Sequence, residues 1–209
     1  MILNWLAAGL TGLFLTWMIN LYNFMDGMDG FAGGMAAFGF GTLAAVGLIQ
    51  GNLAYGLFNL IIAAALGFLV FNFPPARIFM GDVGSSVLGL LAGGSLIWAH
   101  QHGLLSIWIG LIVFSPFVVD ATVTLLRRIL AGEPFWQPHK THYYQRLVQH
   151  GWGHKKTLYW EYALMSLCSA VVLGSLYLPI ANDSLLTLMV LVFYGALLML
   201  THQYAPQSG

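Results

Sequence analysis

The fold is decided by one polar stretch in an otherwise apolar chain, Asn20-Leu21-Tyr22-Asn23-Phe24-Met25-Asp26-Gly27-Met28-Asp29-Gly30-Phe31-Ala32-Gly33-Gly34. It contains two Asn, two Asp and four Gly. No charged residue precedes Asp26, and the next one after Asp29 is Arg77. Carboxylates are costly between segments that a membrane would hold, so such groups are functional by default. The alternative is a loop that only turns the chain, although a turn needs Gly or Asn rather than two carboxylates.

The composition is that of a membrane protein. Hydrophobic residues make up 59% of the 209 residues and charged residues 7%, whereas a soluble domain has about 25% charged residues. The mean hydropathy is +0.80. The formal net charge is zero, which leaves no basic field for nucleic acid. The single cysteine, Cys168, lies in an apolar run and can form no internal disulfide.

Seven segments are long and apolar enough to cross a bilayer, which takes about 20 residues. They cover roughly Leu3 to Leu21, Phe31 to Gln50, Leu53 to Phe71, Gly84 to Ala99, Leu104 to Leu126, Leu158 to Leu178 and Leu185 to His202. Pro74-Pro75 ends the third segment because proline lacks the amide hydrogen that a helix needs. We therefore predict an all-α fold, a polytopic transmembrane bundle of about seven spanning helices that forms one domain over residues 1–209.

Alternating the connections across the membrane puts every Lys and Arg on one side. That side receives the first polar loop around Asp26, the second polar loop (72–86) and the third polar loop (127–157). The positive-inside rule makes it cytoplasmic, with the N-terminus outside and the C-terminus inside. Six of the seven acids lie there too, and only Asp183 lies opposite. Charges of both signs thus gather where a soluble charged substrate would meet a membrane-embedded one.

The second polar loop ends in Asp82-Val83-Gly84-Ser85-Ser86, at the start of a predicted helix. Free backbone amides beside small side chains can cradle a phosphate there. A carboxylate next to a phosphate site most often holds Mg²⁺, a hard cation that prefers oxygen ligands. The alternative is that Asp82 only caps the helix. Because Asp26 and Asp29 lie on the same side, the metal is the favoured interpretation.

The third polar loop carries basic residues near the same face. Arg127 and Arg128 are candidates for substrate contact, or they only anchor the helix end at lipid headgroups. His139 and His142 are three residues apart, but no Cys or third His stands at zinc spacing. Histidine and lysine near a diphosphate more plausibly stabilise charge.

Two of these stretches together resemble a known family. Asn23-Phe24-Met25-Asp26-Gly27-Met28-Asp29-Gly30-Phe31-Ala32 is similar to its pattern N-x-x-D-G-x-D-G-[LF]-A. Phe79-Met80-Gly81-Asp82-Val83-Gly84-Ser85 is similar to F-M-G-D-x-G-S. The family is that of the bacterial polyprenyl-phosphate N-acetylhexosamine-1-phosphate transferases, glycosyltransferase family 4. The resemblance extends from about Leu3 to Lys156 and more loosely over the last two helices.

The resemblance implies transfer of a sugar 1-phosphate from a UDP-sugar to undecaprenyl phosphate, with release of UMP. It implies Mg²⁺ as cofactor, with Mn²⁺ as the alternative, and a multi-pass location in the bacterial inner membrane with a cytoplasmic active site. Asp82 would hold the metal, Asp29 and Asn72 would contact uridine, and Phe79 would stack on uracil. The predicted catalytic residues are Asp26, Asp29, Asp82 and His142. The predicted substrate-binding residues are Asn20, Asn23, Asn72, Phe79, Gly84, Ser85, Arg128 and His139.

Two departures from the family pattern affect these expectations. The third family motif has His-x-His-His, whereas only His142 matches it here, with His139 nearby; this variant resembles the branch that starts O-antigen or capsule synthesis. The family also has an adjacent Asp-Asp pair on an earlier loop, and this sequence contains none. We therefore expect a chain that lacks the N-terminal third of the family architecture.

Three other interpretations remain open. One is a catalytically inactive fragment, and another is a membrane partner subunit that acts in a homodimer or with a separate N-terminal half. A transporter, the third, would need carboxylates in mid-membrane and internal symmetry, and the sequence predicts neither.

Overall fold

The structure, a computed structural model, describes residues 2–53, 55–134, 140–177 and 183–205. This part of the chain contains helices and no strand. The helices are α1 (Ile2–Met25), α2 (Phe31–Ile49), α3 (Tyr55–Asn72), α4 (Gly81–Gln101), α5 (Ile107–Val113), α6 (Ser115–Leu130), α7 (Tyr143–Leu147), a π-helical turn (Val148–Trp152), α8 (Gly153–Ser175) and α9 (Asp183–Tyr204). Six spans are long and apolar enough to cross a membrane, and a bent pair makes up to seven. The predicted all-α polytopic membrane bundle is confirmed.

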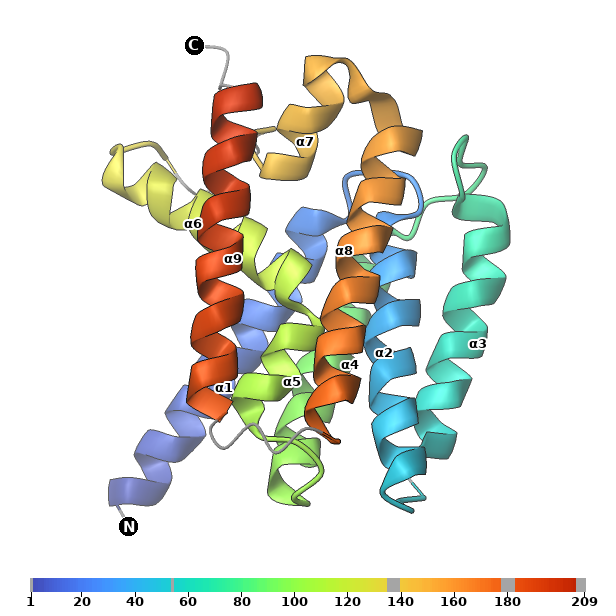
Figure 1. Cartoon of the computed structure of the whole chain (residues 1–209), viewed down its shortest axis with the longest axis vertical. Coiled ribbons are helices and arrows are strands. Elements are labelled where there is room, and N and C mark those ends of the chain that lie inside the picture. The colour runs from blue at the N-terminus through green and yellow to red at the C-terminus, as the bar shows by residue number, and fades with distance from the viewer. Residues whose placement is uncertain (1, 54, 135–139, 178–182, 206–209) are drawn as a thin grey trace.

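The polar connections gather at one end of the bundle. Figure 1 shows the α1–α2 and α3–α4 connections at the same end as α7 and the last turn of α9. The N-terminus and the α2–α3 turn lie at the other end. This arrangement agrees with the predicted alternation of the loops. That the polar end faces the cytoplasm stays a prediction.

The fifth predicted span, Leu104 to Leu126, is not one helix. α5 ends at Val113, α6 starts at Ser115, and the two helices are bent by 91°. Pro116, in the first turn of α6, has no amide hydrogen to continue the helix, and its ring would clash with the preceding turn. The Ser115 hydroxyl donates to the Ile112 carbonyl at 2.6 Å, which satisfies a group that the break leaves open. The break carries α6 toward the polar end and out to one side of the bundle (Figure 1).

α1 and α4 approach so closely that their backbones touch. A Cβ added at Gly89 of α4 would lie 2.7 Å from Cα of Ile19 in α1, and Gly93 one turn later faces Leu15 and Met18. Small residues permit such an approach between membrane helices, whose association depends on close packing. This contact fixes the relative positions of the two helix ends that carry the first and second polar loops.

Candidate functional site

Asn72, the last residue of α3, joins the first and second polar loops. Its Oδ1 accepts a hydrogen bond from the Gly30 amide at 2.9 Å, and its Nδ2 donates to the Ile78 carbonyl at 2.8 Å. Asp29 Oδ2 accepts a second bond between the loops, from the Ala76 amide at 3.1 Å. Gly30 has a φ of 75°, a left-handed conformation that favours glycine. The two loops therefore form one surface, although they are far apart in sequence.

A pocket of about 230 Å³ opens on this surface. It is lined by Asp26, Gly27, Met28, Asp29, Asn72, Phe79 and His154. The Phe79 side chain is 77% exposed, so a flat apolar ring stands beside polar groups. His154 Nδ1 lies 3.7 Å from Asp29 Oδ1. An aromatic face next to a carboxylate and an imidazole suits a flat heterocycle that also carries polar groups.

Asp26 and Asp82 are the two carboxylates beside the pocket that are best placed for a cation. Among the described residues, neither carboxylate accepts a hydrogen bond. Burial, and then the negative charge of Asp82, raise the pKa of Asp26 to about 6. Asp82 is exposed in the first turn of α4, while Met80 occupies the N-cap position and makes no side-chain capping bond. The capping alternative for Asp82 is therefore wrong.

The donor set fits Mg²⁺ better than zinc. Mg²⁺ is usually held by one or two carboxylates together with water and substrate phosphates, and Asp26 and Asp82 provide two carboxylates that interact electrostatically. In the described ranges, no group of three or more His, Cys, Asp or Glu side chains is placed to hold a metal ion. A zinc site of protein ligands thus finds no support in this part of the chain.

Two predicted substrate-binding residues, Asn23 of α1 and Ser85 of α4, join these helices. Asn23 Nδ2 donates to Ser85 Oγ at 3.2 Å. The Ser85 hydroxyl is fully buried and lies 3.2 Å from the Gly81 carbonyl. Gly84 lies close to the Met80 side chain of the preceding turn. Asn20 is exposed, its amide donates to the Thr16 carbonyl at 2.7 Å, and it does not line the pocket.

Apart from His154, the described residues of the third polar loop do not line the pocket. His142 is buried, and its Nδ1 lies 3.2 Å from Asp120 Oδ1. Arg128 is also buried; it pairs with Glu133 at 3.0 Å and donates to the Pro134 carbonyl at 2.8 Å. Arg128 is thus engaged within its own loop. His139 lies outside the described residues.

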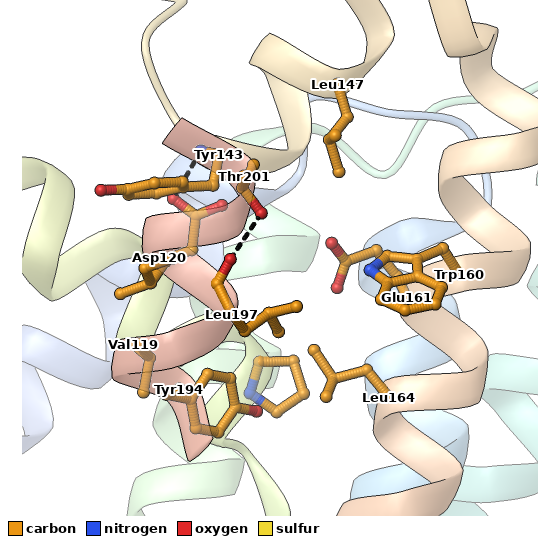
Figure 2. Close-up of a pocket in the computed structure, with 12 residues that line it drawn as sticks. Val119, Asp120, Tyr143, Leu147, Trp160, Glu161, Leu164, Tyr194, Leu197 and Thr201 are labelled. Carbon is orange, nitrogen blue, oxygen red and sulfur yellow. Dashed lines mark hydrogen bonds between the residues drawn. The ribbon is translucent and has the colours of Figure 1, made fainter. Parts of the chain in front are cut away.

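Sequence reasoning missed that His154 lines the pocket and that two acids are buried in the protein. His154 follows the Gly151-Trp152-Gly153 turn, and this polar run before an apolar segment was the available signal. Asp120 of α6 and Glu161 of α8 are both buried within the protein. They line a small cavity of about 30 Å³ with Tyr143 (Figure 2). Such a volume holds about one water molecule.

We expect Asp26→Asn to stabilise the metal-free protein at neutral pH but not in acid. The ordinary pKa of 3.8 is raised to about 6 in the folded state, so the ionised carboxylate costs stability. That cost is absent below about pH 4, grows through pH 4 to 6 and is complete above it. The gain should be on the order of 1 kcal/mol, since the side chain is partly exposed.

The measurement is thermal unfolding in detergent with a chelator, at pH 7.5 and pH 4.5. Asp183→Asn, at the exposed start of α9, is the matched control. An equal change in unfolding temperature at both pH values would contradict the raised pKa of Asp26.

Comparison with known proteins gives matches over both polar loops. A model of glycosyl transferase family 4 matches residues 1–100. A probable undecaprenyl-phosphate N-acetylglucosaminyl 1-phosphate transferase of Bacillus subtilis is 38% identical over 178 residues, which are 83% of this chain and 50% of that protein. A phospho-N-acetylmuramoyl-pentapeptide-transferase of Levilactobacillus brevis is 37% identical over 59% of this chain and 38% of its own. One of Staphylococcus aureus is 35% identical over 70% of this chain and 46% of its own. The chain spans about half the length, or less, of these curated relatives.

Proposed function

Because this chain belongs to glycosyl transferase family 4, we propose that it serves in transferring a sugar 1-phosphate from a UDP-sugar to undecaprenyl phosphate, with release of UMP. The sugar is of the N-acetylhexosamine type, and the product starts O-antigen, capsule or another cell-envelope polysaccharide. The similarity to a probable undecaprenyl-phosphate N-acetylglucosaminyl 1-phosphate transferase supports the lipid acceptor, and this relative and the phospho-N-acetylmuramoyl-pentapeptide-transferases support the sugar class. The observation that carries the proposal is the pocket between the two polar loops, which holds Asp26, Asp29 and Phe79 together.

The nucleotide is proposed to bind in this pocket. The exposed Phe79 ring offers a stacking face for the base, and Asp29 offers acceptor oxygens for ribose or uracil N–H and O–H groups. His154, across from Asp29, adds an imidazole that can donate to an anionic or carbonyl oxygen. Asn72 uses its amide to hold both loops in place, so its contribution includes the shape of the pocket.

Asp82, with Asp26 beside it, is proposed to hold Mg²⁺ at the diphosphate. The bound ion would neutralise the charge of the diphosphate. In the transfer, a lipid phosphate oxygen forms a bond to the β-phosphorus as the bond from that phosphorus to the bridging oxygen breaks, and UMP leaves with that oxygen. Such reactions depend mainly on positioning and charge stabilisation. The polar end of the bundle is proposed to face the cytoplasm of the bacterial inner membrane, where a soluble nucleotide sugar meets the lipid.

We expect Phe79→Ala to weaken UDP binding about tenfold, the size of one lost aromatic–base stack. Isothermal titration of the protein in nanodiscs with UDP measures it. Phe193→Ala, an exposed ring in α9 outside the pocket, should leave the affinity unchanged. Equal affinities of the wild type and the Phe79 variant would contradict base stacking at this site.

Turnover tests the proposed function as a whole. With undecaprenyl phosphate, Mg²⁺ and UDP-N-acetylglucosamine or a related UDP-sugar, the purified chain alone in nanodiscs should release little or no UMP, because its sequence contains no Asp-Asp pair. Supplying a family member's N-terminal helices, fused or in trans, should restore UMP release. UDP binding without UMP release in either form would favour a nucleotide-binding membrane subunit. Failure to bind UDP would contradict the nucleotide site itself.

A further inference from the structure

Asp120, on α6, is a buried carboxylate that the proposed reaction does not yet use. Its Oδ1 accepts from the Tyr143 amide at 2.9 Å and the Thr124 hydroxyl at 3.1 Å, and lies 3.2 Å from His142 Nδ1. Its Oδ2 accepts from the Tyr144 amide at 3.0 Å. Figure 2 shows the carboxylate directly beside Tyr143, where α7 begins. One side chain therefore sets the position of three consecutive residues, His142, Tyr143 and Tyr144.

The contact between Asp120 and His142 selects one form of the imidazole. The Gln145 backbone amide, at the third position of α7, competes as a donor to the His142 side chain in a capping box. A carboxylate can only accept, so a hydrogen bond between Asp120 and His142 requires the hydrogen on Nδ1. In the neutral ring Nε2 is then the acceptor, and in the cation it is a second donor. Because His142 is the residue that matches the family's third motif, this choice determines what the ring can do toward a phosphate or a proton.

Tyr144 connects the start of α7 to the first polar loop. Its ring packs against Phe31 with centroids 4.9 Å apart. Its hydroxyl donates to the Phe24 carbonyl at 3.4 Å. The hydroxyl also lies so close to Gly27 that a side chain there would collide with it. Phe24 and Gly27 flank Asp26, so the start of α7 is a support for the turn that carries a proposed metal-site carboxylate.

We propose that Asp120 is a positioning residue of the site: it holds His142 in the Nδ1–H form and, through Tyr144, holds the turn around Asp26. The proposal rests on the proposed transfer for its kinetic consequences, but the two positions can be measured without turnover. Asp120 does not line the nucleotide pocket. It therefore acts on rate through His142 and Tyr144 rather than on UDP affinity.

The first test is spectroscopic and uses the wild-type chain in detergent micelles. Protein labelled with ¹⁵N-histidine should give His142 ring signals of the Nδ1–H form at pH 8, assigned by their loss in His142→Gln. Asp120→Asn should remove this preference, while Thr124→Val, which removes only one donor to Asp120, should retain it. A wild-type ring in the Nε2–H form would overturn the proposal, and so would an unchanged signal in Asp120→Asn. The wild-type spectrum tests the proposal even if a variant fails to fold.

The second test separates positioning from a merely structural role. Asp120→Asn should lower kcat for UMP release on the order of 10²-fold, as loss of a supporting carboxylate commonly does. KM for the UDP-sugar and UDP affinity should stay within about twofold of the wild type, because the pocket lining is unchanged. Tyr144→Phe should show a smaller loss in kcat, since it removes only the bond to Phe24.

A parallel loss of UDP affinity and thermal stability with no separate effect on kcat would overturn the proposal. If the wild type shows no turnover even with the N-terminal helices supplied, the proposed transfer fails, and the histidine spectra still decide the role of Asp120.

Discussion

Replacing Asp82 with Asn is expected to lower Mg²⁺-dependent UMP release by about 10³-fold, the scale of losing a positioned charge at a phosphoryl-transfer site. Asn has the same size as Asp and one oxygen, but no negative charge to hold a divalent cation. Asp82 is exposed in the first turn of α4, and its carboxylate makes no hydrogen bond within the described chain. The fold should therefore tolerate the change, and the loss should come from the metal rather than from unfolding.

Two measurements check this expectation. UMP release is followed over a range of Mg²⁺ concentrations, and UDP binding is titrated with and without Mg²⁺, so that the metal effect is visible even where turnover is slow. Asp183→Asn removes an exposed acid at the opposite end of the bundle and serves as control. Undiminished turnover and undiminished Mg²⁺ enhancement of UDP binding in Asp82→Asn would exclude it as a metal ligand.

Gly89→Val should be the most destabilising substitution in the bundle interior, by about 3 kcal/mol. A Cβ at this position would lie 2.7 Å from Cα of Ile19, and a backbone atom cannot move aside as a side-chain end can. α1 and α4 would have to separate, which would also displace the first and second polar loops. We expect a lower unfolding temperature together with weaker UDP binding.

The same helix offers a matched control. Gly94 of α4 has open space where a Cβ would stand, so Gly94→Val makes the same chemical change without the collision. Both variants lose the same glycine flexibility, and the difference between them isolates the helix contact. Equal unfolding temperatures for the two would mean that α1 and α4 do not pack as described.

The membrane spans were predictable because each one must meet the demands of the bilayer within its own short segment of sequence. Each crossing needs about 20 apolar residues and must satisfy its backbone within its own helix. The break after α5 was not predictable in the same way. Pro116 is visible in the sequence, but spanning helices often tolerate proline because neighbours satisfy the freed groups. Only the 91° bend of the folded chain shows that α6 leaves the direction of α5.

Site residues that belong to a short sequence pattern were predictable. Those that reach the site from distant segments of the chain were less so. The two polar loops contain Asp26, Asp29 and Phe79 as recognisable patterns. His154 reaches the pocket only because the chain turns back at Gly151 and Gly153, whose φ values are 97° and 68°. The hydrogen bonds of Asn72 to backbone groups of both loops could not be predicted from residue spacing either.

The bonds made by Asn72 and Asp29 also constrain how this protein can be recombined with its relatives. A chimera whose crossover falls between residues 30 and 72 combines a first polar loop from one parent with a second polar loop from the other. The two halves would then meet at hydrogen bonds that each parent had fitted to its own backbone. Crossovers placed before Asn23 or after Ser85 transfer the first and second polar loops together, as one cassette. Helices outside residues 23–85 can then be exchanged without separating these bonded groups.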